Sequence, residues 1–209
     1  MTRFRYASMS RRAAIAAATL AAMATVAGCS GNTGGASEGD MAQGAPEGAK
    51  VTVVEYASVT CGVCAAWNAQ VWPEIKAKYV DTNKVRFVFR EFPTPPQDIA
   101  VAGFLIARCA GEDKYFDVVH DIMASQSEWA AGVAPRTTLF RAAAAAGLSQ
   151  EQTEACIRDE KAIQAMSDRI KAGIDAGVTG TPTFLVNGVK VADPSITGLS
   201  TAIDEALAK

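Results

Sequence analysis

The chain has 209 residues, 49% of them hydrophobic, and its net charge is −2. From Val51 onward about 160 residues remain, which is enough for one domain with a sizeable core. Beyond the N-terminal segment the sequence has no cluster of basic residues, so its charge pattern does not suggest nucleic acid as a partner.

The first 28 residues have the pattern of an export signal. Four arginines up to Arg12 precede an apolar run of small residues, Ala13 to Ala27, and Cys29 follows directly. The end of this segment, Val-Ala-Gly-Cys, resembles the lipobox of bacterial lipoproteins, which implies cleavage before Cys29 and lipidation of that cysteine. A membrane-spanning anchor is the alternative, but the apolar run is shorter than the roughly 20 residues that cross a bilayer.

The segment after Cys29 is rich in Gly, Ser, Ala and Pro up to residue 50 and has no apolar periodicity. Such a composition is typical of a flexible linker. We therefore predict that residues 29–50 form a lipid-anchored tether and that residues 51–209 form the folded domain.

Two cysteines, Cys61 and Cys64, lie where a strand is predicted to give way to a helix. The strand is the β-branched run 51–56, and apolar residues at helical spacing begin at Trp67. Unpaired N–H groups and the helix dipole favour a thiolate at Cys61 and lower its pKa from the usual value of about 8.5. We expect Cys61 to attack and Cys64, one turn further into the helix, to resolve.

A single C-x-x-C pair also occurs in zinc sites and in structural disulfides. Zinc would need two more ligands, for which the candidates are Cys109, Cys156 and the only histidine, His120. None of them forms a second ligand pair. A structural disulfide across so short a loop would constrain the unfolded chain little.

The remaining cysteines, Cys109 and Cys156, lie in two helical patterns. In an oxidising compartment they would form a disulfide that closes a long loop, whereas two separate buried thiols are the alternative. We predict the bridge and no metal site.

Beyond the C-x-x-C helix, the pattern predicts a strand at 84–91, helices from 97 to 176, a hairpin around Asn187-Gly188 and a final helix at 196–208. The expected helices are about 97–110, 113–125, 136–146, 149–158 and 160–176, and Pro73 is expected to kink or restart the first helix. This order is that of an α/β protein and resembles a thioredoxin fold with an all-helical domain, at about 97–176, inserted between its N- and C-terminal halves.

The chain resembles the DsbA-like branch of the thioredoxin superfamily. The resemblance is carried by Glu55 followed six residues later by Cys61-Gly-Val-Cys64, by Trp72-Pro-Glu-Ile-Lys-Ala-Lys-Tyr79, by Val85-Arg-Phe-Val-Phe-Arg-Glu-Phe-Pro93 and by Gly180-Thr-Pro-Thr-Phe-Leu-Val-Asn-Gly188. These motifs cover both ends of the domain.

The resemblance implies roles for three further residues. The bond between Thr181 and Pro182 would be cis and pack against the cysteines, leaving the backbone of Thr181 free to bind an extended substrate; an ordinary trans proline is the alternative. Glu55 matches the buried acid near the resolving cysteine, and its flanking residues predict burial. An edge position facing water is the alternative for Glu55, and His120 is expected to be a packing residue.

These features predict a thiol–disulfide oxidoreductase, in which Cys61 and Cys64 form the redox-active disulfide. Its partners would be unfolded or partly folded exported proteins, a membrane redox partner and, through Cys29, the lipid membrane. We expect a monomer without a bound cofactor, anchored in the bacterial cell envelope and facing the periplasm.

The direction of electron flow stays open. We expect disulfide formation, with a reductase or isomerase as the alternative. Two features support the alternative: Gly62 and Val63 stand where the strongest oxidants of the family have a proline and a thiolate-stabilising histidine, and Thr181 before the proline resembles the isomerase-type members. A rival of another class is a non-enzymatic lipoprotein that binds a soft metal such as Cu(I) between the two thiolates.

Overall fold

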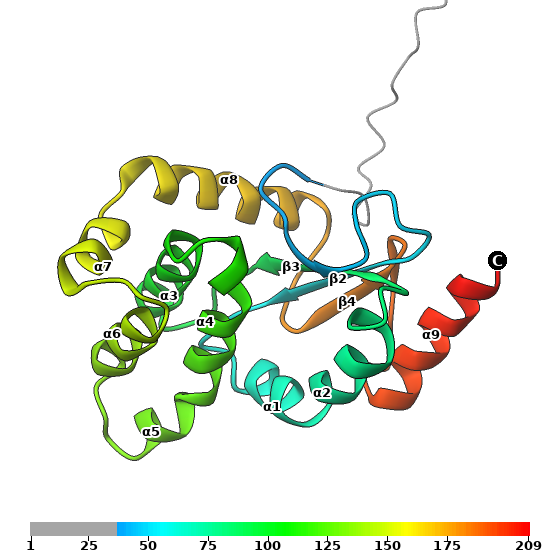
Figure 1. Ribbon diagram of the computed structural model, residues 1–209, viewed down its shortest axis with the longest axis horizontal. Helices are drawn as coiled ribbons and strands as arrows, with labels where there is room; N and C mark the ends of the chain where they lie inside the picture. Colours follow the sequence, from blue (N-terminus) through cyan, green and yellow to red (C-terminus); the bar gives the residue numbers. More distant parts are fainter. Residues whose placement is uncertain (1–36) are drawn as a thin grey trace, which may run out of the picture. The chain divides into compact units, whose positions relative to one another are not determined.

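The computed structural model describes residues 37–209 and places a five-stranded mixed sheet at the centre of the domain (Figure 1). The strand order is β1-β3-β2-β4-β5. The strands are β1 (Met41–Gly44), β2 (Thr52–Ala57), β3 (Arg86–Glu91), β4 (Thr183–Val186) and β5 (Val189–Lys190). Only β2 and β3 are parallel; β1 pairs with β3, and β4 with β2 and β5, in antiparallel register.

Helices connect β2 to β3 and β3 to β4. The first connection contains α1 (Gly62–Gln70), α2 (Trp72–Ile75) and a π-helical turn, η1 (Lys76–Val80). The second contains α3 (Gln97–Cys109), α4 (Glu112–Ala124), α5 (Gln126–Ala130), α6 (Pro135–Ala145), α7 (Gln150–Ile157) and α8 (Glu160–Asp175), and α9 (Ile196–Ala208) closes the chain. This is the predicted architecture, with the helical block between the two halves of the sheet.

Local chemistry accounts for where these elements begin and end. Pro73 occupies the first turn of α2, which confirms that it restarts the helix rather than interrupting one. Ser149 and Gln152 form a capping box at the start of α7. The hairpin turn between β4 and β5 has positive φ at both Asn187 and Gly188, as a type I′ turn requires.

The two faces of the sheet are packed differently. Inward side chains of β2 and β3 such as Val53 and Phe87 join one large core with α1, α2, α3, α4 and α9. The opposite face carries a smaller cluster around Val54 and Tyr56. There Gly173 of α8 lies so close to the ring of Tyr56 that a Cβ atom would be 3.0 Å from it.

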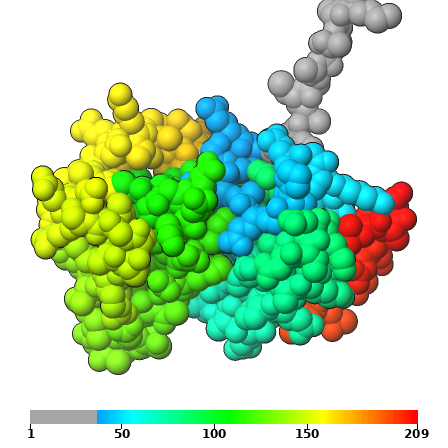
Figure 2. Space-filling view, viewed as in Figure 1, coloured from blue at the N-terminus to red at the C-terminus, as the bar shows by residue number. Residues whose placement is uncertain are grey.

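The predicted tether was wrong for the residues that precede β2. Met41–Gly44 forms strand β1 along the outer edge of β3, and Asp40 pairs with Arg90 of β3 at 2.8 Å. Figure 2 shows this segment, in blue, lying against the atoms of α8, where Gly39 approaches Arg169. Sequence composition missed the strand because it has only four residues and pairs with a segment more than 40 positions away.

The predicted export signal at residues 1–28 and the predicted lipidation of Cys29 lie outside the described residues. Within residues 37–209, no helix combines the length and the apolar character that crossing a membrane requires.

Candidate active site

Cys61 and Cys64 form a disulfide at the N-terminus of α1, and their Cα atoms are 5.2 Å apart. Cys61 is the N-cap residue, and its Sγ accepts a hydrogen bond from the backbone N–H of Cys64 at 3.1 Å. The side chain of Cys64 is completely buried, whereas Cys61 is partly exposed. The structure therefore gives an attacking group access to the sulfur of Cys61 and shields that of Cys64.

The two residues between the cysteines are exposed. Val63 is 66% exposed, and neither it nor Gly62 has a polar side chain that could donate to Cys61. Stabilisation of a Cys61 thiolate therefore comes from the backbone N–H groups and the dipole of α1.

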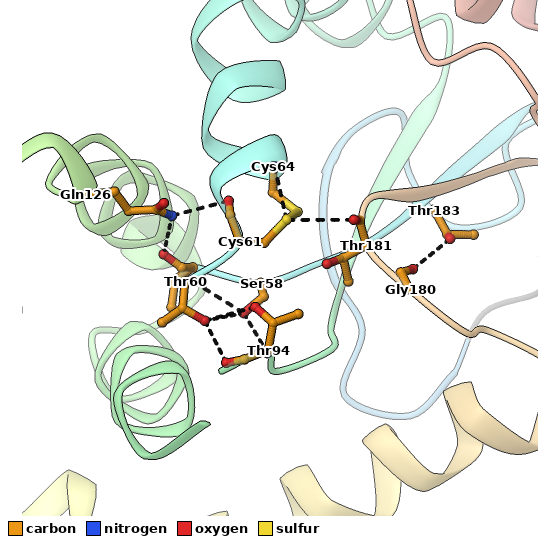
Figure 3. Close-up of a disulfide and its surroundings, with 10 residues drawn as sticks. Ser58, Thr60, Cys61, Cys64, Thr94, Gln126, Gly180, Thr181 and Thr183 are labelled. Atoms are coloured by element: carbon orange, nitrogen blue, oxygen red, sulfur yellow. Dashed lines mark hydrogen bonds between the residues drawn. A yellow bond between two sulfur atoms is a disulfide. The ribbon is translucent and has the colours of Figure 1, made fainter. Parts of the chain in front are cut away.

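Hydroxyl groups hold the loop that leads from β2 into Cys61 (Figure 3). The buried Oγ of Ser58 accepts hydrogen bonds from the backbone N–H groups of Thr60 and Thr94 at 3.3 and 3.1 Å. Oγ1 of Thr60 donates to the carbonyl of Thr94 at 2.8 Å. These bonds join the end of β2 to the loop after β3 and fix the backbone just before Cys61.

Gln126 at the start of α5 reaches the same turn from the helical block (Figure 3). Its Nε2 donates to the carbonyl oxygens of Val59 at 2.8 Å and of Cys61 at 3.3 Å. The active-site turn is thus bonded to both parts of the fold.

Thr181 and Pro182 lie beside the disulfide, joined by a cis peptide bond as the resemblance implied. The carbonyl oxygen of Thr181 is 3.7 Å from the Sγ of Cys61, although 120 residues separate them in sequence. The loop is held by Thr183, whose Oγ1 donates to the carbonyl of Gly180 at 2.8 Å. Both Thr181 and Pro182 are partly exposed, so this backbone is accessible beside the exposed sulfur.

Glu55 is buried in the middle of the sheet, so the alternative of a water-facing edge position is wrong. It is 4% exposed, lies between Phe89 of β3 and Phe184 of β4, and shares a face with Val53, which belongs to the same core as Cys64. Its carboxyl makes no hydrogen bond or ion pair with any described residue. Burial disfavours the charged form and raises the pKa of Glu55 to about 8.

Two predicted features lie elsewhere in the domain. Cys109 at the end of α3 and Cys156 in α7 form a second disulfide, with Cα atoms 6.0 Å apart, which staples two helices of the block. His120 packs between Trp72 and Phe116, and burial lowers its pKa to about 4. The histidine is therefore a neutral packing residue at pH 7.

Potential metal ligands do not gather around the cysteine pair. Across residues 37–209, no group of three or more His, Cys, Asp or Glu side chains is placed to hold a metal ion. The structure thus adds no ligand for the zinc or Cu(I) alternatives.

Sequence reasoning missed the polar residues that support the turn, namely Ser58, Thr60, Thr94 and Gln126. The only signal in the sequence is the hydroxyl-rich stretch just before Cys61. Gln126 could not be found, because 65 residues separate it from Cys61 and nothing in its helix marks it.

Comparison with known proteins gives consistent matches. The family model described as Thioredoxin matches residues 36–205. A Rickettsia bellii protein named a protein-disulfide oxidoreductase is 36% identical over 172 residues, which cover 81% of this chain and 65% of that protein. A Rickettsia conorii protein named in the same way is 39% identical over 160 residues, covering 75% and 57%.

Among solved structures, Wolbachia pipientis alpha-DsbA1 superposes with a TM-score of 0.75 at 26% identity, covering 83% of this chain and 94% of that one. A thioredoxin-like oxidoreductase from Silicibacter pomeroyi gives a TM-score of 0.65 at 25% identity, covering 83% and 95%. The chain spans 57–65% of the length of the two Rickettsia relatives.

Proposed function

The chain belongs to the thioredoxin family, and we propose that it is a thiol–disulfide oxidoreductase that acts on exported proteins through Cys61 and Cys64. The observation that carries this proposal is the asymmetry of the disulfide at the N-terminus of α1. One sulfur is accessible beside the Thr181 backbone and the other is buried.

In the direction of disulfide formation, a client thiolate attacks the sulfur of Cys61 and the electron pair of the broken bond leaves on Cys64. The second client thiolate then attacks the client sulfur of this mixed disulfide and releases Cys61 as a thiolate. Two electrons pass from the client to the enzyme, and a membrane redox partner would remove them. The same steps in reverse reduce a client disulfide.

Two residues would assist this exchange. The backbone of Thr181 would pair with an extended client segment and bring its sulfur to Cys61. Glu55, which is protonated at neutral pH because its pKa is about 8, would give a proton to the Cys64 thiolate and take it back on reversal. Its burial on the same side of the sheet as Cys64 supports this role.

The protein would work at a membrane. The lipobox-like segment supports lipidation of Cys29, which would anchor a monomeric domain in the bacterial cell envelope, facing the periplasm, near emerging chains and the redox partner. The sequence similarity to proteins named protein-disulfide oxidoreductases agrees with the proposed activity.

Equilibration with glutathione distinguishes an oxidase from a reductase. A reduction potential of about −120 mV would place the pair with the strong oxidants, and one of about −270 mV would make it a reductant that needs an electron supply. The absence of a polar side chain at Gly62 and Val63 favours a couple less oxidising than the first value.

The activity is tested by oxidation of a reduced, unfolded protein and by reduction of insulin, each with the full chain. Cys61→Ser should abolish both activities, because it removes the only accessible sulfur of the pair. The double variant Cys109→Ala/Cys156→Ala is the matched control and should keep both, since that bridge joins α3 and α7 within the helical block and includes neither Cys61 nor Cys64. A Cys61→Ser protein that remains active would refute the mechanism.

A further inference from the structure

Gln126 stands at the junction between α4 and α5 and is the point at which the helical block bonds to the active-site turn. Both of its side-chain hydrogen bonds end on backbone carbonyls of that turn, those of Val59 and Cys61. The carbonyl of Cys61 also accepts the N–H of Ala65, the first hydrogen bond of α1. The amide therefore bonds to the backbone that sets where Cys61 lies relative to its helix.

The position occupied by the Gln126 side-chain nitrogen requires a hydrogen-bond donor. Two carbonyl oxygens converge on one side-chain atom, and a primary amide nitrogen has two N–H bonds, one for each. The amide oxygen lies on the other side, 3.8 Å from where a Cβ of residue 62 would be. The reversed amide, or a carboxylate, would put oxygen against oxygen.

The junction that carries Gln126 is itself fixed. Ser125 is buried, and its Oγ donates to the carbonyl of Asp121 at 2.8 Å, closing the last turn of α4. Four residues later, Nε1 of Trp129 donates to Oγ1 of Thr138 in α6 at 2.7 Å. Bonds on both sides thus hold the backbone from which Gln126 projects.

We propose that Gln126 is a positioning residue for thiol–disulfide exchange, holding the Cys61 turn in its exchange-competent shape when the active-site disulfide opens. The inference rests on the proposed function and adds a residue to it. In the oxidised protein the covalent bond to Cys64 fixes Cys61. In the reduced protein that constraint is gone, and the hydrogen bonds from Gln126 and from the Cys64 N–H remain to keep the sulfur at the start of α1.

Loss of the hydrogen bonds from Gln126 should therefore destabilise the reduced form more than the oxidised form. A looser turn brings Cys61 less often within reach of the Cys64 N–H, which weakens stabilisation of the thiolate. Two observable quantities follow, the equilibrium with glutathione and the pKa of the Cys61 thiol.

The test uses the full chain with Gln126→Met, which keeps the length of the side chain and removes its donors. We expect the equilibrium with glutathione to move about tenfold toward the disulfide, which is about 30 mV for a two-electron couple. We also expect the pKa of Cys61, read from the ultraviolet absorbance of the thiolate, to rise. Gln126→Glu, which turns an oxygen toward both carbonyls, should shift both quantities in the same direction.

Gln164→Met is the matched control, because Gln164 is an exposed glutamine of α8 whose only side-chain hydrogen bond within residues 37–209 is to Asp168 of the same helix. It should leave both quantities unchanged. An equilibrium constant for Gln126→Met within twofold of wild type, with the same Cys61 pKa, would overturn the inference. If the wild-type chain does not exchange with protein substrates, the proposed function fails, whereas the Cys61 pKa comparison still tests Gln126.

Discussion

At the scale of single residues, Glu55 is the clearest case of a side chain whose buried environment disfavours its usual ionised form. A carboxyl in the centre of a sheet, between two phenylalanines and without a partner among the described residues, is stable there as the neutral acid. Its raised pKa, about 8, means that the folded protein holds a proton that the unfolded chain releases at neutral pH.

The stability of wild type should therefore fall as pH rises from about 4.5 to 8, because unfolding releases the Glu55 proton throughout that interval. Glu55→Gln has no proton to lose. Relative to it, wild type should lose about 3–5 kcal/mol of unfolding free energy between pH 4 and pH 9, at roughly 1.4 kcal/mol per pKa unit. Urea unfolding at both pH values measures the difference.

Glu205→Gln is the control, because Glu205 is exposed on α9 and its variant should follow the wild-type pH curve. If the stabilities of Glu55→Gln and wild type stay parallel from pH 4 to pH 9, Glu55 is not the buried acid described above.

Sequence predicted the local geometry of single residues where one short motif determines it. The cysteine pair at a strand–helix boundary and the Thr-Pro before a strand each have a recognisable pattern within a few positions, and both lie at the site. The burial of Glu55 also followed from its apolar neighbours. The position of Gln126 beside the active-site turn could not be predicted in this way, because its hydrogen-bond partners are 65 and 67 residues away in sequence.

At the scale of elements, a buried charge cluster fastens the helical block to the sheet. Glu91 at the end of β3 is 2% exposed and accepts from Nε of Arg108 in α3 and, at 3.3 Å, from Nε of Arg169 in α8. Tyr115 of α4 donates to the same carboxylate at 3.2 Å. The first and last helices of the block are thus tied to one strand end.

Glu91→Gln should lower the unfolding free energy by about 3 kcal/mol at pH 7, because it leaves two largely buried guanidinium groups without their counter-charge. The exposed pair of Glu128 and Arg141 provides the control, since solvent screens it, and Glu128→Gln should change stability far less. Equal stability losses in the two variants, measured in urea, would contradict this account of the cluster.

Element prediction worked for long periodic segments and failed for short ones. Helices α3, α4, α6, α7, α8 and α9 lie within two residues of their predicted bounds, because each repeats its apolar residues over two turns or more. Strand β1 and the five-residue α5 were missed. Neither has enough residues for a pattern, and both make hydrogen bonds to distant parts of the chain, β1 to β3 and Gln126 of α5 to Val59 and Cys61.

At the scale of the whole domain, the site forms where three distant segments meet. The turn that holds Cys61 lies after β2, the helical block contributes Gln126, and the loop before β4 contributes Thr181 (Figure 3). The second disulfide joins α3 and α7 within the helical block. The order of predicted elements was enough to predict this architecture. The hydrogen bonds that join its parts could be found only in the structure.

The most direct measurement of the central claim identifies which sulfur forms the bond to a client. Full-length Cys64→Ala and Cys61→Ala are each reduced and incubated with a peptide that carries an activated mixed disulfide, and the adducts are located by mass spectrometry. Because only Cys61 is accessible at the start of α1, Cys64→Ala should form a stable Cys61–peptide disulfide, and Cys61→Ala should form no adduct at Cys64. An adduct at Cys64 in the second variant, or none at Cys61 in the first, would contradict the proposed mechanism.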